Sequence, residues 1–371
     1  MCYRTDHPVV AHCSAAESQR GAALVTTLLI VALITITVTS MATRQQLSIQ
    51  KASNRQVQSQ LHNLASAGEQ FAVAVLNRDR READRNNSDS TEDYWAESLP
   101  PVPVDGATVE GCVIDLQGKF NLNNLVDIEG NTDQLEFEAL QRLLRVLTID
   151  SLKAESILDW IDPNIDATGT DGAEDDFYTG QTPAYRAANG PMVSPTELLL
   201  VKGFRVTDEG GLDDYDTLLP HISTLPTGSA INVNTASAPV LASLADYMIE
   251  LSDELKVVDD DYWENYPDCP EGGGLLDTVI NSEADPADSE PVTDEEIVDD
   301  GFIYENRDDF IQSSKVSDDE NLETANIDVT SGYFMSRVTV RRDEISLTQY
   351  TTLYRDNTGA VTTLQRSRGG L

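Results

Sequence analysis

Basic residues are scarce in this chain. In 371 residues, 25 Lys and Arg stand against 64 Asp and Glu, which gives a formal net charge of -39 and a pI near 4.1. A chain this anionic repels phosphate backbones, so we expect no nucleic-acid partner. The acidity is strongest between residues 251 and 330, where 26 Asp and Glu meet three Lys and Arg. This stretch is either a solvated acidic surface or, in part, a binder of divalent cations.

Histidine is rarer still, and of the four in the chain only His62 and His221 lie beyond residue 21. Neither has a neighbour at metal-ligand spacing, so zinc hydrolysis has little support. The sequence also lacks a Gly-x-Ser-x-Gly elbow and a phosphate-binding loop. Pairs of carboxylates do not by themselves exclude a glycosidase, but a chain this acidic contains such pairs by chance. We therefore expect no enzyme.

Cysteine is limited to four residues, and two of them, Cys2 and Cys13, lie ahead of the long apolar run described next. Cys112 and Cys269 remain in the rest of the chain. In an oxidising compartment these two can form one disulfide, and two free buried thiols are the alternative.

A long apolar run is present near the N-terminus. Residues Ala22 to Met41 include no charged side chain, and about 20 such residues span a bilayer as a helix. Arg4 and Arg20 before the run and the acidic chain after it predict an N-terminus inside and an exported remainder. The run is too long for a cleavable secretory signal, and no small-residue cleavage site follows it. A plain single-pass anchor with an unprocessed N-terminus is the simplest alternative.

The residues around this run resemble a known leader. Gly21 stands directly before the run, and the helical pattern continues to about Arg80. This arrangement resembles the class III leader of type IV pilins and type II secretion pseudopilins. The resemblance implies that a prepilin peptidase cuts after Gly21 and methylates the new N-terminus, Ala22. Most members carry Glu at the fifth mature position, where this chain has Thr26, and that departure resembles the K-type minor pseudopilins.

Three further segments are similar to the K-type family. They are Asp115–Val126, the acidic stretch Asp159–Pro191, and the large insertion that separates the first strand from the β-rich segments after about Asn326. The resemblance implies an α+β, pilin-like fold, in which a long N-terminal helix packs on an antiparallel sheet, with a large inserted, mainly α-helical domain. The expected parts are a leader (1–21), the membrane half of the helix (22–41), the first pilin-like part (42–127), the inserted calcium-binding domain (128–325) and the C-terminal strands (326–371).

Local patterns predict the elements within these parts. Residues 107–116 alternate as a strand, and the charged, proline-bearing residues 79–103 predict a loop. Helices are expected at 132–146, 151–160, 194–204 and, as a short one, 302–311. The segment 230–244 echoes residues 120–125, which suggests a weak internal repeat. It also resembles a helix-hairpin-helix unit, but no basic residue follows, so we interpret it as a packing unit without nucleic acid.

The acidic stretch is the candidate metal site. Asp162, Asn164, Asp166 and Thr168 alternate as ligands do in an EF-hand loop, but Ala167 occupies the position of the required glycine. The inserted domain of the K-type family binds calcium, and the resemblance implies calcium here. The ligands that we expect are Asp162, Asp166, Asp171, Glu174, Asp175 and Asp176.

The function that the resemblance implies is that of a minor pseudopilin of a type II secretion system. Such a subunit is anchored in the inner membrane with its globular part in the periplasm. It forms the tip of the pseudopilus with the I- and J-type minor pseudopilins, and contacts the major pseudopilin through them. Two alternatives stay open: a minor pilin of a type IV pilus, and a membrane-anchored calcium-binding adhesin.

Overall fold

The computed structural model describes residues 19–82, 88–249, 269, 303–313, 322 and 324–368. The predictions for Cys2, Cys13 and the acidic residues 271–300 lie outside these ranges. The chain divides into two compact units, residues 1–60 and 61–371, and each is described by itself.

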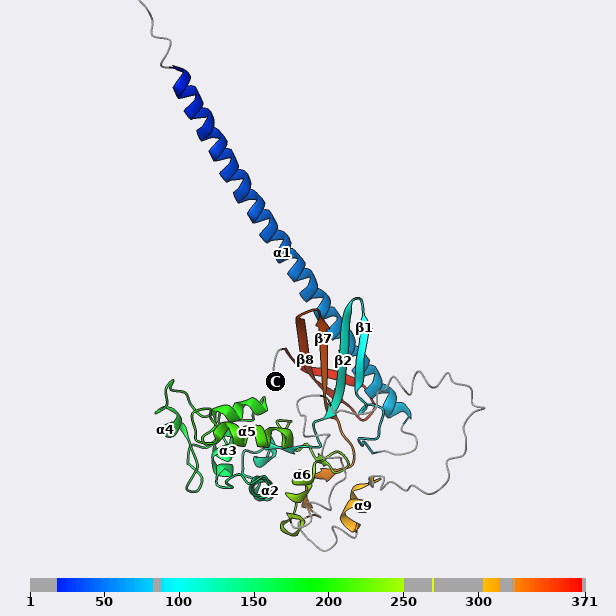
Figure 1. Ribbon diagram of the computed structural model, residues 1–371. Coiled ribbons are helices and arrows are strands. Elements are labelled where there is room, and N and C mark those ends of the chain that lie inside the picture. Colours follow the sequence, from blue (N-terminus) through cyan, green and yellow to red (C-terminus); the bar gives the residue numbers. More distant parts are fainter. Residues whose placement is uncertain are drawn as a thin grey trace, which may run out of the picture. The chain divides into compact units, whose positions relative to one another are not determined.

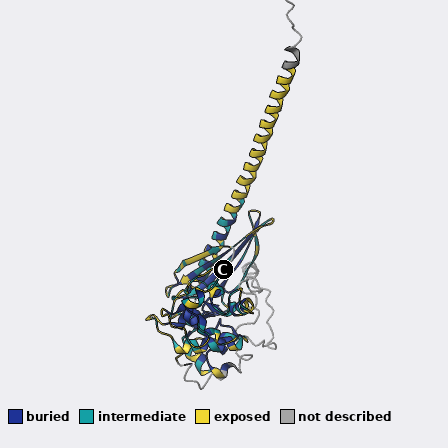
Figure 2. Cartoon of the chain, turned by 90° about the vertical axis from the view of Figure 1, so that its left-hand side faces the viewer, coloured by how far each residue is buried: buried dark blue, intermediate teal, exposed yellow. Residues whose placement is uncertain are grey.

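The first unit is the N-terminal part of helix α1 (Gln19–Glu82). Its side chains from Ala23 to Gln56 are exposed, as the yellow stretch of the helix in Figure 2 shows. Within the described residues, α1 is the one helix that is long and apolar enough to cross a membrane. The threonine hydroxyls of this stretch donate to carbonyls of the preceding turn, as from Thr35 to Val31 (2.8 Å) and from Thr37 to Leu33 (2.7 Å). Each of these two hydroxyls is therefore satisfied without water, as an apolar environment requires.

The second unit contains a five-stranded antiparallel sheet against which the C-terminal part of α1 packs (Figure 1). Leu61, Ala65, Ala72 and Leu76 form the buried face of the helix, at spacings of four, seven and four residues. A Cβ on Gly68 would lie 2.6 Å from Cγ1 of Val338, so the glycine allows close packing of helix and sheet. The strands, in spatial order, are β1 (Leu99–Val104), β2 (Ala107–Asp115), β7 (Tyr333–Arg342), β8 (Ile345–Arg355) and β9 (Val361–Arg368).

The first strand corrects a sequence prediction. Residues 79–103 were expected to form a loop, but α1 continues to Glu82 and β1 begins at Leu99. The sequence did not predict this strand because it contains Pro100, Pro101 and Pro103. Proline has no N–H to donate to a neighbouring strand. They are tolerated because β1 lies at the edge of the sheet. Strands β1 and β2 are joined by Asp105 and Gly106, both with positive φ, as a tight hairpin requires.

A buried carboxylate fixes α1 to β9, the edge strand opposite β1. Glu69 of the helix accepts hydrogen bonds from Nε and Nη2 of Arg366 on β9, both at 2.7 Å. Gln349 and Thr363 donate to the same carboxylate at 2.9 and 3.0 Å. These bonds, those from Arg366 above all, hold the pKa of Glu69 below its usual value despite its burial.

Between β2 and β7 lies a long, mainly helical insertion, with its apolar residues in one continuous core. Its first part contains β3 (Phe120–Asn121), η1 (Leu122–Leu125), α2 (Gln134–Val146), α3 (Lys153–Ile161), α4 (Asp175–Tyr178), η2 (Pro195–Leu200), α5 (Gly211–Leu218), η3 (Leu219–His221) and β4 (Ile222–Ser223). Its second part contains β5 (Ile231–Asn232), α6 (Ala238–Ala242), η4 (Asp246–Ile249), α9 (Arg307–Gln312) and β6 (Ile327–Asp328).

The two parts of the insertion repeat one device. Strand β3 pairs in parallel with β4, which ends the first part, and β5 pairs in parallel with β6, which ends the second. Two residues after the β3 asparagine, Asn123 accepts from the N–H of Met192 (2.8 Å) and donates to its carbonyl (3.0 Å). Asn234 does the same with Tyr304, at 2.9 Å in both directions. The echo between residues 120–125 and 230–244 is therefore a structural repeat.

Two predicted helices differ from the structure. The helix expected over 194–204 is a 3-10 turn, η2, which Ser194 caps through the N–H of Thr196 and which ends because Val201 is extended. The helix expected from 302 begins at Arg307, after the cap Asn306, whose side chain accepts from the N–H of Asp309. In both, local capping decides the boundary.

Candidate functional site

Helix α3 carries two carboxylates, one turn apart, that hold the acidic loop after it. Glu155 accepts from the N–H groups of Thr170 (2.8 Å) and Asp171 (2.6 Å). Asp159 accepts from the N–H of Thr168 with both oxygens, at 3.0 and 3.1 Å. These two side chains of α3 therefore accept hydrogen bonds from backbone N–H groups of the loop, which are not part of a helix or a sheet.

Glycines make that approach possible. A Cβ on Gly172 would lie 2.4 Å from Oδ2 of Asp159, and one on Gly169 would lie 2.2 Å from Oε1 of Glu155. Gly169 also has a φ of +60°, where glycine is favoured. The glycines of the acidic stretch thus bring the backbone against the carboxylates.

Asp162 and Glu174 lie at the two ends of the acidic loop, and both are buried. Asp162 is the C-cap of α3 and is 1% exposed, and Glu174 is the N-cap of α4 and is 6% exposed. None of their four carboxylate oxygens has a hydrogen-bond partner in the described part of the chain. Burial and the charge of Asp159 raise the pKa of Asp162 to about 6. Burial and the charges of Asp159, Asp162 and Asp175 raise the pKa of Glu174 to about 7.

The other expected ligands are engaged elsewhere or face solvent. The carboxylate of Asp171 lies 2.7 Å from Nζ of Lys202. Asp175 pairs with Arg186 at 3.2 Å and accepts from the N–H of Ala187. Asp166 and Asp176 are exposed. The structure brings together Asp162 and Glu174 from the expected six.

Asp159 is the residue that sequence reasoning left out of the expected ligands. It is fully buried and its charge acts on both Asp162 and Glu174. Its position three residues before Asp162, on the same face of α3, was the available signal.

The chemistry of this cluster, Asp159, Asp162 and Glu174, fits a hard divalent cation. Buried carboxylates without proton donors are costly unless a cation or a proton offsets their charge. As it stands, no group of three or more acidic, histidine or cysteine side chains within the described ranges is arranged so that it could hold a metal ion. A bound ion would therefore require these side chains to rearrange.

An aromatic cluster packs next to the acidic loop. Trp160 of α3 meets Tyr178 of α4 edge-to-face at 5.2 Å between ring centroids, and Tyr178 meets Tyr185 at 5.3 Å. The hydroxyl of Tyr178 accepts from the N–H of Lys202. These rings connect the acidic loop to the core of the insertion.

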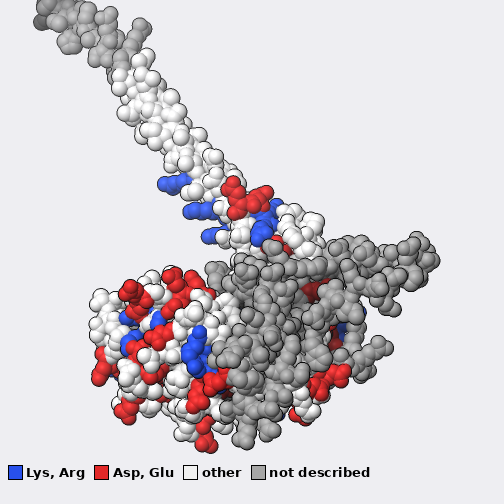
Figure 3. Space-filling view, turned by 60° about the horizontal axis from the view of Figure 1, so that its bottom comes forward, with Lys and Arg blue, Asp and Glu red and all other residues white. Residues whose placement is uncertain are grey.

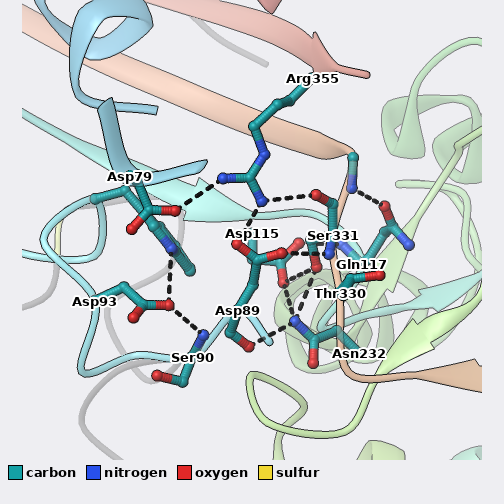
Figure 4. A network of polar contacts seen from close by, with 12 residues as sticks. Asp79, Asp89, Ser90, Asp93, Asp115, Gln117, Asn232, Thr330, Ser331 and Arg355 are labelled. Atoms are coloured by element: carbon teal, nitrogen blue, oxygen red, sulfur yellow. Dashed lines mark hydrogen bonds and ion pairs between the residues drawn. The ribbon is translucent and has the colours of Figure 1, made fainter. Parts of the chain in front are cut away.

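A second polar centre joins the insertion to the sheet (Figure 4). Asp115, the last residue of β2, is fully buried. Its Oδ2 accepts from the hydroxyls of Ser331 and Thr235, both at 2.6 Å, and from the amide of Asn232 at 3.1 Å. Burial raises the pKa of Asp115 to about 6, although these donors oppose the shift. Asp115 thus links the sheet to the second part of the insertion.

Arg355, the last residue of β8, adds a cation to this centre. It pairs with Asp79 of α1 at 2.9 Å, pairs with Asp89, and donates to the carbonyl of Ser331 at 2.9 Å. The Arg355 side chain is 2% exposed, so helix, sheet and insertion meet around one buried guanidinium.

A disulfide adds a covalent link to the sheet. Cys112 of β2 and Cys269 are bonded, with their Cα atoms 5.6 Å apart. The disulfide joins the sheet to the chain between η4 and α9, and such bonds are typical of proteins in oxidising compartments.

The comparisons with known proteins agree with this architecture. Residues 118–227, the first part of the insertion, match the family model "Type II secretion system (T2SS), protein K". The type II secretion system protein K of Pseudomonas aeruginosa is 35% identical over 239 residues, which cover 62% of this chain and 68% of the relative. That of Aeromonas hydrophila is 31% identical over 256 residues, covering 65% and 75%.

A solved structure shows the same fold. A chain of the GspK-GspI-GspJ complex from enterotoxigenic Escherichia coli matches with a TM-score of 0.64 and 21% identity, over 86% of this chain and all of that one. The resemblance to the K-type family, stated from Thr26, the segments Asp115–Val126 and Asp159–Pro191 and the large insertion, is confirmed. The chain belongs to the type II secretion system protein K family and is a minor pseudopilin of that system.

Proposed function

We propose that this minor pseudopilin caps the tip of a periplasmic pseudopilus and helps to start its assembly with the I- and J-type minor pseudopilins, and through them with the major pseudopilin. The large insertion between β2 and β7 carries this proposal, and Thr26 agrees with it. The Thr26 hydroxyl donates to the carbonyl of Ala23 in its own helix, at 3.0 Å. No carboxylate is present there to neutralise the N-terminal amine of a subunit above. The large insertion between β2 and β7 would also obstruct such a subunit.

The membrane steps belong to the same proposal. The prepilin peptidase cuts after Gly21 and methylates Ala22, α1 stays in the inner membrane, and the disulfide-bonded part lies in the periplasm. The exposed apolar face of α1 and the Cys112–Cys269 bond support this placement. The relative of known structure was solved in complex with GspI and GspJ, which supports the choice of partners.

Mass analysis of the mature N-terminus tests processing. A methylated Ala22 is the expected result, and an intact leader on functional protein would contradict the proposal. For the tip position we expect Thr26→Glu to leave secretion nearly unchanged, because the bulk of the head decides the placement. A loss of secretion on this single change would show that the residue, and not the head, governs it.

Calcium is part of the proposed function. Asp162 and Glu174, with Asp159 beside them, would hold the ion, whose charge would offset the repulsion among these carboxylates. The orphaned buried oxygens of Asp162 and Glu174 support this proposal. The role of the ion is structural, because the acidic loop then stays closed against α3.

A further inference from the structure

The outer part of α1 carries positive charge only. From Gln19 to Gly68 the chain has no acidic residue, and after the apolar run its charged side chains are Arg44, Lys51 and Arg55. Spacings of seven and four residues place these three within about 20° of one line along the helix, over about 16 Å. We call these three residues the basic stripe. Figure 3 shows basic side chains projecting from one side of α1 beside its uncharged stretch.

The basic stripe has no partner among the described residues. All three side chains are exposed, and no ion pair joins any of them to the part of the chain that the structure describes. Several other cations of the described chain pair with carboxylates, as Arg355 does with Asp79 and Asp89 and Lys202 does with Asp171. In a chain of net charge -39, an uncompensated row of cations on one helix face indicates an intermolecular contact.

Membrane insertion does not explain the basic stripe. Lys and Arg near a span normally mark its cytoplasmic side, yet two (Arg4 and Arg20) precede this span and three follow it within 14 residues of Met41. The disulfide places the following side in an oxidising compartment. The stripe therefore opposes the usual topology signal.

Lipid headgroups account for one residue of the stripe at most. The polar layer adds about 5–8 Å on each side of the hydrocarbon core. At about 1.5 Å per residue, Arg44 lies about 4–5 Å beyond Met41, within that layer. Lys51 and Arg55 lie about 15 and 21 Å beyond Met41, outside it.

A second copy of the chain is also a poor partner. Two copies anchored in one membrane run parallel, and contact through this face would bring like charges together, which is unfavourable.

We propose that the basic stripe binds an acidic stripe, at the same spacing, on the N-terminal helix of a neighbouring pseudopilin of another type. This proposal rests on the proposed assembly. Such pairs contribute little affinity each, but they set which helix neighbours which and in what register.

The test compares two full-length variants of equal net charge. Arg44→Gln/Lys51→Gln/Arg55→Gln removes the stripe, and Gln46→Glu/Gln50→Glu/Ser53→Glu adds three carboxylates on the opposite face. Each is co-expressed with full-length I- and J-type minor pseudopilins, purified in detergent at low and high salt, and the recovered partner is measured. The first variant should reduce recovery about tenfold at low salt and the second less than twofold. Equal losses in both would overturn the proposal.

A crosslinker at Ser48, which lies between Arg44 and Arg55 on the stripe, gives a second measurement, with Ser53 as the matched site on the opposite face. Crosslinked in cells, Ser48 should form an adduct with another pseudopilin and Ser53 should not. If the unmodified chain recovers neither I- nor J-type subunit, the proposed assembly fails, and the Ser48 adduct still decides the stripe. Adducts of Ser48 with lipid alone, or no adduct at Ser48, would overturn the proposal. It would also be overturned if the variant without the basic stripe lost binding to vesicles of anionic lipid but still recovered the partner.

Discussion

The acidic residues of this protein act very differently from one position to the next. Glu69 and Glu174 are both about 5% exposed, yet Glu69 is surrounded by donors while Glu174 has none in the described part of the chain. The pKa of the first is lowered and that of the second is raised to about 7. One therefore stabilises the fold as an anion and the other destabilises it.

Replacement of Glu69 tests the first case. Glu69→Gln removes a paired charge beneath Arg366 and should lower the free energy of unfolding by about 2 kcal/mol, the range for hydrogen bonds to charged groups. Denaturant unfolding of the detergent-solubilised chain measures this loss. Arg341→Gln is the control, because it breaks an ion pair with Glu110 at the surface. The Arg341 side chain is 56% exposed, so this variant should lower the free energy of unfolding by under about 0.5 kcal/mol. Equal effects would show that Glu69 is no more than a surface charge.

Replacement of Glu174 tests the second case. In chelator at pH 7.5, Glu174→Gln should raise the melting temperature, because it removes a buried anion that has no donor. Added calcium should raise the melting temperature of the unmodified chain and have little effect on the variant. Asp176→Asn, at an exposed position, serves as the matched control and should change neither result. A variant that melts lower in chelator would refute this account of the cluster.

At the scale of elements, the sequence predicted the strands whose residues follow a regular β pattern and missed the strand that does not. The alternation in residues 107–116 and the β-rich composition of the three C-terminal segments predicted β2, β7, β8 and β9. Of these strands, β2, β7 and β8 have buried positions on the core. Strand β1 was hidden by prolines that only its edge position permits. Which carboxylates of the acidic stretch face inward was not predictable, since Lys202 and Arg186 engage Asp171 and Asp175 through tertiary contacts.

The repeated asparagines give a prediction at this scale. Asn123 makes three buried bonds, one from the N–H of Met192 and two to the carbonyls of Met192 and Leu225. Asn123→Ala leaves those backbone groups unpaired and should cost about 2–4 kcal/mol in chemical unfolding. The control Asn131→Ala removes exposed bonds to Asp127 and should cost about 0.5 kcal/mol or less. If the two variants unfold alike, the asparagine device of the repeat does not hold the insertion together.

For the whole molecule, the dominant fact is an excess of buried acid. Burial raises the pKa of Asp93, Asp115 and Asp162 to about 6 and those of Glu136 and Glu174 to about 7. Between the ordinary carboxyl pKa of about 4 and these values, the folded protein binds more protons than the unfolded chain does. Stability contributed by these groups is therefore present at low pH and is lost as the pH rises through about 6 to 7. Burial lowers the pKa of His221 to about 4 and lowers that of Lys119, and both groups act in the opposite sense, but the five carboxyl groups outnumber them. The lowered pKa of Glu69 also acts in the opposite sense, but only below about pH 4.5.

The expected outcome is a fold that melts at higher temperature at pH 5.5 than at pH 7.5 when calcium is chelated. Relief of repulsion in a chain of net charge -39 acts in the same direction. Calcium should add more at pH 7.5 than at pH 5.5, because at the lower pH protons compete for Asp162 and Glu174. Scanning calorimetry of the full chain in detergent, with and without chelator at both pH values, measures all four states. A chelated protein that loses stability steadily from pH 7.5 to 5.5 would mean that these carboxylates are solvated, and that neither protons nor calcium are needed to keep the insertion closed.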